Sequence, residues 1–547
     1  MKISEAILRY LKINGVDVIF GIPAGTISPI FDAMNDVNIR PIVTKNEGGA
    51  AYCATRYANL TKRLGVCIGA GGVGVSNMLN GILDAKRSKA PVLIISGFVH
   101  RWQIGKGAIQ EQDTVDIFKP VTKYSKMVLE PSEVMNELKM AIKAAYTVPQ
   151  GPVFLCIPVD VQSSEFVGEL AERITLTDYS SKYIDFRVLQ KAIDIIDKEE
   201  HGIIMAGKGC RGLSKDIMAL SERLQWPIIT TPSGKGVIPS GFALNLGNYG
   251  FTSSDAAEEY VEKGPATCVL ALGTSMGEAS TGNYNKVLLK NRKLIHIDYD
   301  SNELGKVFDP DLKLNVDLRL ALPELVKRVR ETKKVFNWTL SKEILGVGNN
   351  ALSVKVFFER IHEVLPSDTS YLCDIGEYMN FALKYLSIPQ YSEFEFSINY
   401  GAMGTAIGGA PGAYLANPEK RVAVFAGDGC FFMNGTEILT AKEYNLPIIY
   451  FIINNSMLGY VEHGHQYLYG RSLECFKQAR VSICEMAKCM GIRAMQIRNN
   501  EEIVKITDFV SYNEGPCLIE VVIDGTEPPP IVGRLKALKQ FSEEKIS

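Results

Sequence analysis

The sequence contains no long apolar run and no block of like charges. None of its apolar runs approaches the ~20 residues that a membrane-spanning helix needs, and Met1-Lys-Ile-Ser-Glu5 lacks the basic region and apolar core of a signal peptide. Lys and Arg number 59 against 61 Asp and Glu, which leaves a formal charge of −2. Because nucleic acids and anionic membranes attract a basic excess, we expect a small-molecule partner, no nucleic acid, no membrane and a cytoplasmic location.

Cysteine and histidine give no sign of a disulfide framework or a zinc site. The eleven cysteines are dispersed, odd in number and without a Cys-x-x-Cys pair, which is typical of reduced and mostly buried thiols. The six histidines show no His-x-x-x-His spacing and no cluster with cysteine. We therefore expect neither a disulfide-rich domain nor a zinc enzyme.

What the 547 residues do contain is a repeated pattern of strand followed by helix. A chain of this length is too long for one core. Continuous apolar runs typical of buried parallel strands alternate with helical stretches. These runs are at 16–20, 41–44, 64–69, 91–97 and 151–158, then at 202–206, 226–231, 267–272 and 293–298 with a charged helix at 321–334, and finally at 371–374, 422–426, 448–453 and 517–523.

Two breaks divide this pattern into three parts. The chain is polar and irregular from 161 to 185, which indicates a linker, and Gly346-Val-Gly-Asn-Asn350 marks a second boundary. The sequence therefore predicts an α/β protein of three doubly wound parallel-sheet domains. Their predicted ranges are 1–165, 186–335 and 351–535. The first and third parts look like variations on one architecture.

Polar residues follow two neighbouring strands of the third part. The run 421–427 ends in Asp428-Gly429, and the run 446–453 ends in a pair of asparagines of which Asn455 is the second. Two parallel strands joined by a helix would place Asp428 and Asn455 side by side at the carboxyl edge of the sheet. Free N–H groups after Gly429 suit a diphosphate, and the carboxylate, the amide oxygen and a main-chain carbonyl suit Mg²⁺. A lone Gly-Asp-Gly is more often a surface turn, but here two signals agree.

This stretch resembles the thiamin diphosphate and Mg²⁺ binding motif of the thiamin diphosphate enzymes. In that family the metal ligands are the Asp, the second Asn and the main-chain oxygen two residues later, which correspond to Asp428, Asn455 and Met457. The resemblance implies a three-domain fold, with a pyrimidine-binding first domain, a nucleotide-like central domain and a diphosphate-binding third domain. It also implies cofactor contacts from residues near the strand ends: Gly72, Asn77, Gly376, Glu377, Gly401, Met403, Gly427, Gly429, Cys430, Leu458 and Gly459.

Glu47 follows a predicted strand, and most carboxylates in such places are solvated caps. The segment from Glu47 to Ala58 resembles, however, the family's strand-to-helix segment with its activating Glu. The resemblance implies that Glu47 hydrogen-bonds the pyrimidine nitrogen of the cofactor and promotes loss of the thiazolium C2 proton. In the family this Glu and the metal-binding Asp come from different subunits, so a homodimer or homotetramer is implied.

Within the family the resemblance is closest to the acetolactate (acetohydroxyacid) synthases and covers nearly the whole chain. The loop Phe20–Gly25 matches their loop near the substrate, and Ile109-Gln110-Glu111 matches their Phe-Gln-Glu segment. Gly25 and Gln110 are therefore predicted beside the reacting carbon, although Gln110 could equally be an exposed helix amide. Met403 matches the apolar residue that bends the cofactor between its two rings, and core packing is its other interpretation.

Two departures from the synthases concern the acceptor. Ala279 stands where they have an Arg that meets the acceptor keto acid, and Gly464 stands where they have a Trp that shapes the acceptor pocket. Around Gly464 lie Glu462, His463 and His465. These three side chains are either a solvated helix face or acid/base groups over a different acceptor.

The resemblance leaves FAD open, because Phe251-Thr-Ser-Ser254 replaces the Met-His-Gly of the synthases' flavin segment and Val159 replaces a Lys. We predict a carboligase or lyase that uses thiamin diphosphate and Mg²⁺. It would decarboxylate a 2-oxo acid, with pyruvate as the expected donor, and transfer the acyl carbanion to a carbonyl acceptor, giving an acyloin or an acetolactate-like product. The alternatives are a non-oxidative decarboxylase that releases an aldehyde and a homologue that only binds the cofactor. Retention of Glu47 argues against the last.

Overall fold

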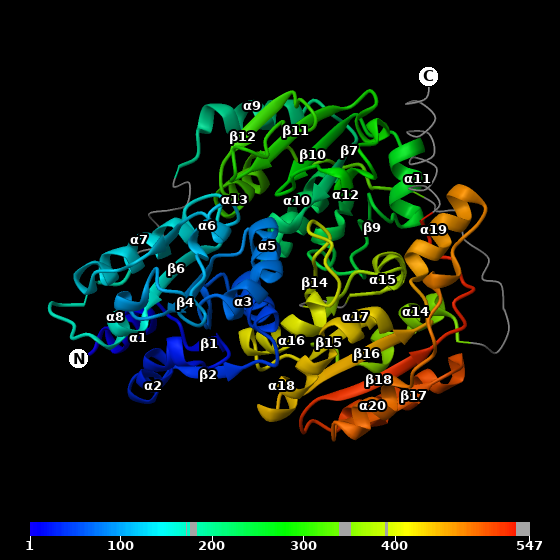
Figure 1. Ribbon diagram of the computed structural model, residues 1–547. Helices are drawn as coiled ribbons and strands as arrows, with labels where there is room; N and C mark the ends of the chain where they lie inside the picture. The colour runs from blue at the N-terminus through cyan, green and yellow to red at the C-terminus, as the bar shows by residue number, and fades with distance from the viewer. Residues whose placement is uncertain (171, 175–182, 339–351, 389–391, 532–547) are drawn as a thin grey trace.

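The computed structural model describes residues 1–170, 172–174, 183–338, 352–388 and 392–531. Within these residues the strands form three six-stranded sheets, and every pairing in a sheet is parallel. In Figure 1 they occupy the blue-to-cyan, green and yellow-to-red parts of the ribbon. The predicted fold class is confirmed. The predicted boundary at 346–350 lies outside the described residues.

The N-terminal sheet has the order β2-β1-β3-β4-β6-β5. Its strands are β1 (Val18–Gly21), β2 (Arg40–Val43), β3 (Gly65–Gly69), β4 (Val92–Phe98), β5 (Ser125–Met127) and β6 (Val153–Pro158). The helices around it are α1 (Ile3–Ile13), α2 (Ser28–Val37), α3 (Glu47–Thr61), α4 (Val73–Asn77), α5 (Leu79–Ser88), α6 (Val115–Phe118), α7 (Val134–Tyr146) and α8 (Val159–Ser163).

The central sheet has a different order, β12-β11-β10-β7-β8-β9. Its strands are β7 (Gly202–Ala206), β8 (Ile228–Thr230), β9 (Asn245–Asn248), β10 (Cys268–Leu272), β11 (Lys293–Asp298) and β12 (Leu312–Asn315). Its helices are α9 (Phe186–Ile196), α10 (Ser214–Leu224), α11 (Asp255–Lys263), α12 (Glu278–Thr281) and α13 (Leu318–Arg328). The charged helix predicted at 321–334 is α13, which begins earlier because Asp317 caps its first turn and ends at Arg328, where the backbone becomes extended.

The C-terminal sheet, β14-β13-β15-β16-β18-β17, repeats the strand order of the N-terminal sheet. Its strands are β13 (Ser370–Cys373), β14 (Phe394–Phe396), β15 (Val422–Gly427), β16 (Ile448–Asn454), β17 (Arg493–Ile497) and β18 (Cys517–Val522). Its helices are α14 (Val354–Val364), α15 (Tyr378–Tyr385), α16 (Thr405–Ala416), α17 (Asp428–Asn434), α18 (Ile438–Glu443), α19 (Gly459–Tyr469), α20 (Ile483–Cys489) and α21 (Lys505–Ser511). The expectation that the first and third parts share one architecture is met by their strand order.

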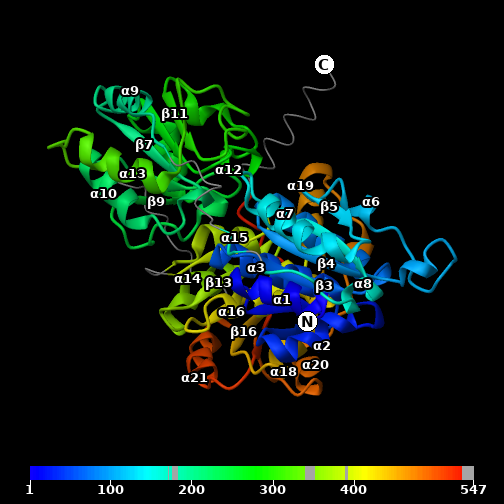
Figure 2. The same cartoon turned by 90° about the vertical axis from the view of Figure 1, so that its left-hand side faces the viewer.

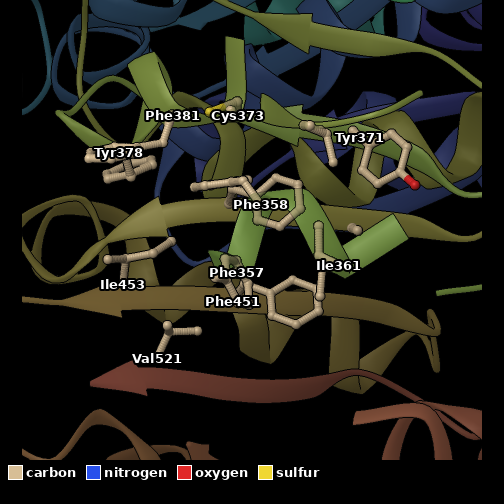
Figure 3. Packing of buried hydrophobic residues seen from close by; sticks show 14 of the residues in the cluster. Phe357, Phe358, Ile361, Tyr371, Cys373, Tyr378, Phe381, Phe451, Ile453 and Val521 are labelled. Atoms are coloured by element: carbon tan, nitrogen blue, oxygen red, sulfur yellow. The ribbon is translucent and has the colours of Figure 1, made fainter. Parts of the chain in front are cut away.

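An aromatic core fixes the two central strands of the C-terminal sheet. Phe357 and Phe358 of α14 are fully buried, and Figure 3 shows them against the face of the sheet. Phe357 meets Phe451 of β16 with ring centroids 5.7 Å apart, and Phe358 meets Phe425 of β15 at 5.1 Å. Burying each such side chain stabilises the fold by about 1.5–3 kcal/mol. The strands that lead to Asp428 and Asn455 are therefore held rigidly.

The N- and C-terminal domains meet where α3 packs along α16, at the centre of both Figure 1 and Figure 2. Small residues allow this close approach: Ala50 and Ala54 of α3 are fully buried, and a Cβ on Gly412 of α16 would overlap the backbone of Cys53. The thiol of Cys53 donates to the carbonyl of Gly408 across the same contact, at 3.1 Å. The helix that starts with Glu47 is thus anchored on the C-terminal domain.

Candidate functional site

Asp428 and Asn455 lie next to each other at the carboxyl edge of the C-terminal sheet. In the register of β15 and β16, Gly427 pairs with Ile453, so the residues that follow leave the sheet together. Asp428 accepts hydrogen bonds from the N–H of Gly429 at 2.9 Å and from the N–H of Ser456 at 2.8 Å. The second bond ties the end of one strand to the turn after the other.

Both side chains are almost completely buried, at 5% exposure for Asp428 and 8% for Asn455. Burial raises the pKa of Asp428 to about 6, because a carboxylate loses its hydration there. A divalent cation at the same carboxylate would restore the favourable environment for the charged form. The buried Asp428 is therefore suited to hold a cation.

The remaining oxygen ligands of the predicted Mg²⁺ site are also at this edge. Asn455 Oδ1 accepts one hydrogen bond, from the N–H of Met457 at 3.1 Å, and keeps a second lone pair. An isolated antiparallel bridge joins Met457 to Lys477. Its hydrogen bonds are accepted by the carbonyls of Ser456 and Phe476, so the carbonyl of Met457 takes no part in the bridge. One carboxylate, one amide oxygen and one main-chain carbonyl fit Mg²⁺. Among the described residues no cluster of three His, Cys, Asp or Glu side chains offers a different metal site.

A cleft of about 1510 Å³ opens over this edge. It lies at the boundary between β13 and β15. There the strand order of the C-terminal sheet reverses, and open α/β sheets bind ligands at such a point. A Cβ on Gly429 would be 3.0 Å from Cε of Met403, so the backbone and the Met side chain form one tight wall. The predicted cofactor residues that line the cleft are Gly376, Glu377, Gly401, Met403, Gly427, Asp428, Gly429, Cys430, Asn455, Met457, Leu458 and Gly459.

A second group of predicted residues gathers at the carboxyl edge of the N-terminal sheet. Glu47 is the first residue of α3, and Asn77 at the end of α4 donates to its Oε2 at 3.0 Å. Gly74 lies beneath Glu47, because a Cβ there would be 3.2 Å from Oε1. A Cβ on Gly72 would be 3.0 Å from the carbonyl oxygen of Gln110, so these two segments are also close together. Gln110 itself is exposed, as in the alternative interpretation, but it lies in a turn with a left-handed φ of 68° and not in a helix.

The two groups do not share one cleft within a single chain. Among the described residues that line the cleft over Asp428, none is Glu47, Gly72, Asn77, Gln110 or Gly25. The structure thus separates the predicted metal ligands, which line the cleft, from the predicted residues around Glu47, which do not.

Of the residues expected near the acceptor, some line the cleft and others do not. Ala279 of α12 lines the cleft, and its carbonyl accepts from the N–H of Phe251 at 2.7 Å. Gly464 faces open space. His463 and His465 are not among the described lining residues: the ring of His465 packs against Tyr469 and Phe476 with centroids 5.1 and 4.9 Å away, and His463 contacts Glu377.

Sequence reasoning missed Glu437, which links the C-terminal domain to the residues just before α3. Glu437 is fully buried, and its Oε1 accepts from the N–H groups of Lys45 and Asn46, at 3.0 and 2.8 Å. Burial raises its pKa, and these donors partly offset that effect. Its position in the sequence carries no motif, because its partners are almost four hundred residues away along the chain.

Comparison with known proteins agrees with this geometry. Three family models match the chain: "Thiamine pyrophosphate enzyme, N-terminal TPP binding domain" at residues 1–117, the central domain of the same family at 189–325, and its C-terminal TPP binding domain at 374–521. The chain belongs to the thiamine pyrophosphate enzyme family. Thiamine pyrophosphate is another name for thiamin diphosphate, so the predicted family is confirmed.

Curated relatives extend the likeness over the whole length. The chain is 30% identical to a probable acetolactate synthase large subunit of Methanocaldococcus jannaschii, over 99% of this chain and 95% of the relative. It is 31% identical to the acetolactate synthase large subunit of Lactococcus lactis, over 96% and 93%. It is 27% identical to acetolactate synthase isozyme 2 large subunit of Escherichia coli K12, over 98% and 100%.

As a member of this family the protein is an enzyme that uses thiamin diphosphate and a divalent metal, Mg²⁺. FAD stays open. None of the helices in the described part of the chain has the length and apolar character that crossing a membrane requires. The roles of individual site residues stay predictions, although the residues are brought together as described.

Proposed function

We propose that this enzyme decarboxylates pyruvate and joins the resulting two-carbon unit to an uncharged carbonyl acceptor. In the donor, the bond between the carboxylate and C2 breaks and CO₂ leaves. C2 keeps the electron pair and forms a new C–C bond to the acceptor carbonyl carbon, whose oxygen takes up a proton. No oxidant or reductant is needed. Bound thiamin diphosphate supplies the electron sink that makes C2 of the donor nucleophilic.

The residues of the chain have separate tasks in this proposal. Asp428, Asn455 and the Met457 carbonyl would hold Mg²⁺, which would in turn neutralise the diphosphate. Glu47 holds a proton at the pyrimidine nitrogen, and Gln110 orients the reacting carbon. Met403, which lies close to Gly429, would support the bound cofactor.

The observation that carries the acceptor proposal is Ala279 in the cleft wall. An Arg fork there would bind a carboxylate by charge-assisted hydrogen bonds, and loss of such a pair costs about 2 to 5 kcal/mol. Arg211 and Arg319 also line the cleft from the central domain, but each is already paired with a carboxylate. Arg101 is held by Asp160 at 2.7 Å and does not supply the missing charge.

The test is a competition with pyruvate as donor, Mg²⁺ and thiamin diphosphate present, and two acceptor sets at equal concentration: pyruvate itself, and uncharged aldehydes and ketones. Products are resolved by mass. We expect acyloins of the uncharged acceptors to dominate. Dominant acetolactate would refute the acceptor proposal, and free acetaldehyde alone would indicate a plain decarboxylase.

We also propose a homodimer or homotetramer in the cytoplasm. Support for the oligomer is that Glu47 does not line the cleft over Asp428 in one chain, so a partner could bring the two groups together. Support for the reducing compartment is that the cysteines are free thiols and most of them are buried.

A further inference from the structure

The carboxylate of Glu377 lies between a predicted metal ligand and a histidine. Asn455 donates from Nδ2 to Oε1 of Glu377 at 2.6 Å. Nδ1 of His463 lies 2.8 Å from Oε2 of the same carboxylate. These three residues come from the turn after β13, the end of β16 and helix α19, so the fold assembles them from distant parts of the chain.

The bond from Asn455 to Glu377 determines which end of the amide faces the cation. A side-chain amide has an oxygen that can bind a metal and an NH₂ group that cannot. With Nδ2 bound to Glu377, Oδ1 points the other way, where it accepts from the N–H of Met457. A flipped amide would place Oδ1 against the carboxylate, and the two oxygens would repel each other.

Helix α19 is built to keep Glu377 in this position. Gly459 and His463 are four residues apart and therefore share one face of the helix. A Cβ on Gly459 would overlap the carboxylate of Glu377, so only glycine leaves room for the acid to reach His463. His463 is further bound to the backbone of Gly525, and these contacts favour its protonated form by raising its pKa.

Burial also favours a partner for the carboxylate of Glu377. The side chain of Glu377 is only 7% exposed and that of His463 19% exposed. A buried carboxylate without a partner is costly, and Asp428 nearby carries the same sign. His463 is the partner of this carboxylate, with Nδ1 2.8 Å from Oε2.

We infer that Glu377 is a positioning residue that orients Asn455 toward Mg²⁺, and that His463 acts by holding Glu377. The inference rests on the Mg²⁺ site of the proposed function but not on its acceptor. Residues that orient metal ligands in this way typically change metal affinity by about 10- to 100-fold when they are removed.

The experiment measures Mg²⁺ binding by calorimetry, with thiamin diphosphate present and no substrate, on the full chain. We expect Glu377→Ala to weaken Mg²⁺ binding by about 10- to 100-fold. Glu377→Gln should stay within about threefold of the wild type, because its amide oxygen can still accept from Asn455. Glu462→Gln is the matched control: it removes a carboxylate beside His463 that bonds to Ser472 and not to Asn455, and Mg²⁺ affinity should not change.

A double variant tests the order of action. If His463 acts through Glu377, Glu377→Ala with His463→Ala should bind Mg²⁺ as weakly as Glu377→Ala alone, since the two losses are not additive. Thermal melting of the metal-free proteins shows that each variant is folded. Wild-type affinity in Glu377→Ala, or a folded Glu377→Gln that is as weak as the alanine variant, would overturn the inference. If the wild type itself bound no Mg²⁺, the proposed metal site would be wrong as well. Failure of the metal site is thus distinguished from failure of the positioning role of Glu377 alone.

Discussion

At the scale of single residues, Glu47 is the side chain whose removal should separate binding from chemistry. Glu47→Gln keeps a hydrogen-bonding group at the start of α3 but cannot exchange a proton. We expect thiamin diphosphate affinity close to that of the wild type and turnover lower by about 10²–10⁴-fold. Cofactor titration and steady-state turnover on the same samples check this. Unchanged turnover would remove Glu47 from the proton-transfer role.

Asp428 and Asn455 should show the opposite behaviour. Asp428→Ala and Asn455→Ala each remove one oxygen ligand, so we expect weaker Mg²⁺ and thiamin diphosphate binding, with activity partly restored by excess cofactor and metal. Titration of both ligands against each variant is the measurement. Ser163→Ala, far along the chain in α8, serves as a surface control. Normal affinity in both site variants would contradict the placement of the metal.

The sequence predicted these two residues because each directly follows a buried strand, and parallel strand ends meet at one edge. It also suggested Glu377 as a cofactor contact, but not its bonds to Asn455 and His463. Those bonds depend on the crossing of α19 over the turn after β13, which no local pattern encodes. His463 and His465 are two residues apart in α19 and therefore face different sides of the helix, so one contacts Glu377 and the other packs on aromatic rings.

At the scale of elements, the strands that sequence reasoning missed share one property. They are β5, β9, β12, β14 and β17, and every one is the edge strand of its sheet. An edge strand has a neighbour on one side only, so it does not need a continuous apolar run. The internal strands are buried on both faces and were predicted within a few residues, as for β15 (Val422–Gly427) against 422–426.

The contact between α3 and α16 gives a prediction about stability. Gly412→Ala would press a methyl group into the backbone at Cys53, and overpacking of this kind costs about 1–3 kcal/mol. We expect a lower melting temperature. Gly464→Ala in α19 is the matched control, because its Cβ meets nothing and alanine favours a helix by about 1 kcal/mol over glycine. Equal melting of Gly412→Ala and wild type would show that the two helices can separate without cost.

At the scale of the whole molecule, the two domains with the same strand order each carry one group of the predicted site residues. The N-terminal edge holds Glu47 and Asn77, and the C-terminal edge holds Asp428 and Asn455. Composition and pattern were sufficient to predict three α/β domains. They could not show that Glu47 lies outside the cleft over Asp428, since its place depends on how α3 packs against α16.

If two chains complete each other's sites, damage to different halves should complement. Glu47→Gln and Asp428→Ala chains are co-expressed with different tags, and the mixed dimer is purified through both. One of its sites then combines an intact Glu47 with an intact Asp428, and the other combines both defects, so we expect about half of the wild-type turnover per dimer. The control pairs Glu47→Gln with the double variant, in which no site regains an intact Glu47, and it should stay inactive. If each chain instead formed its own complete site, the mixed dimer would have one defect in every site. Turnover no higher than that of the single-variant proteins would therefore rule out the shared arrangement.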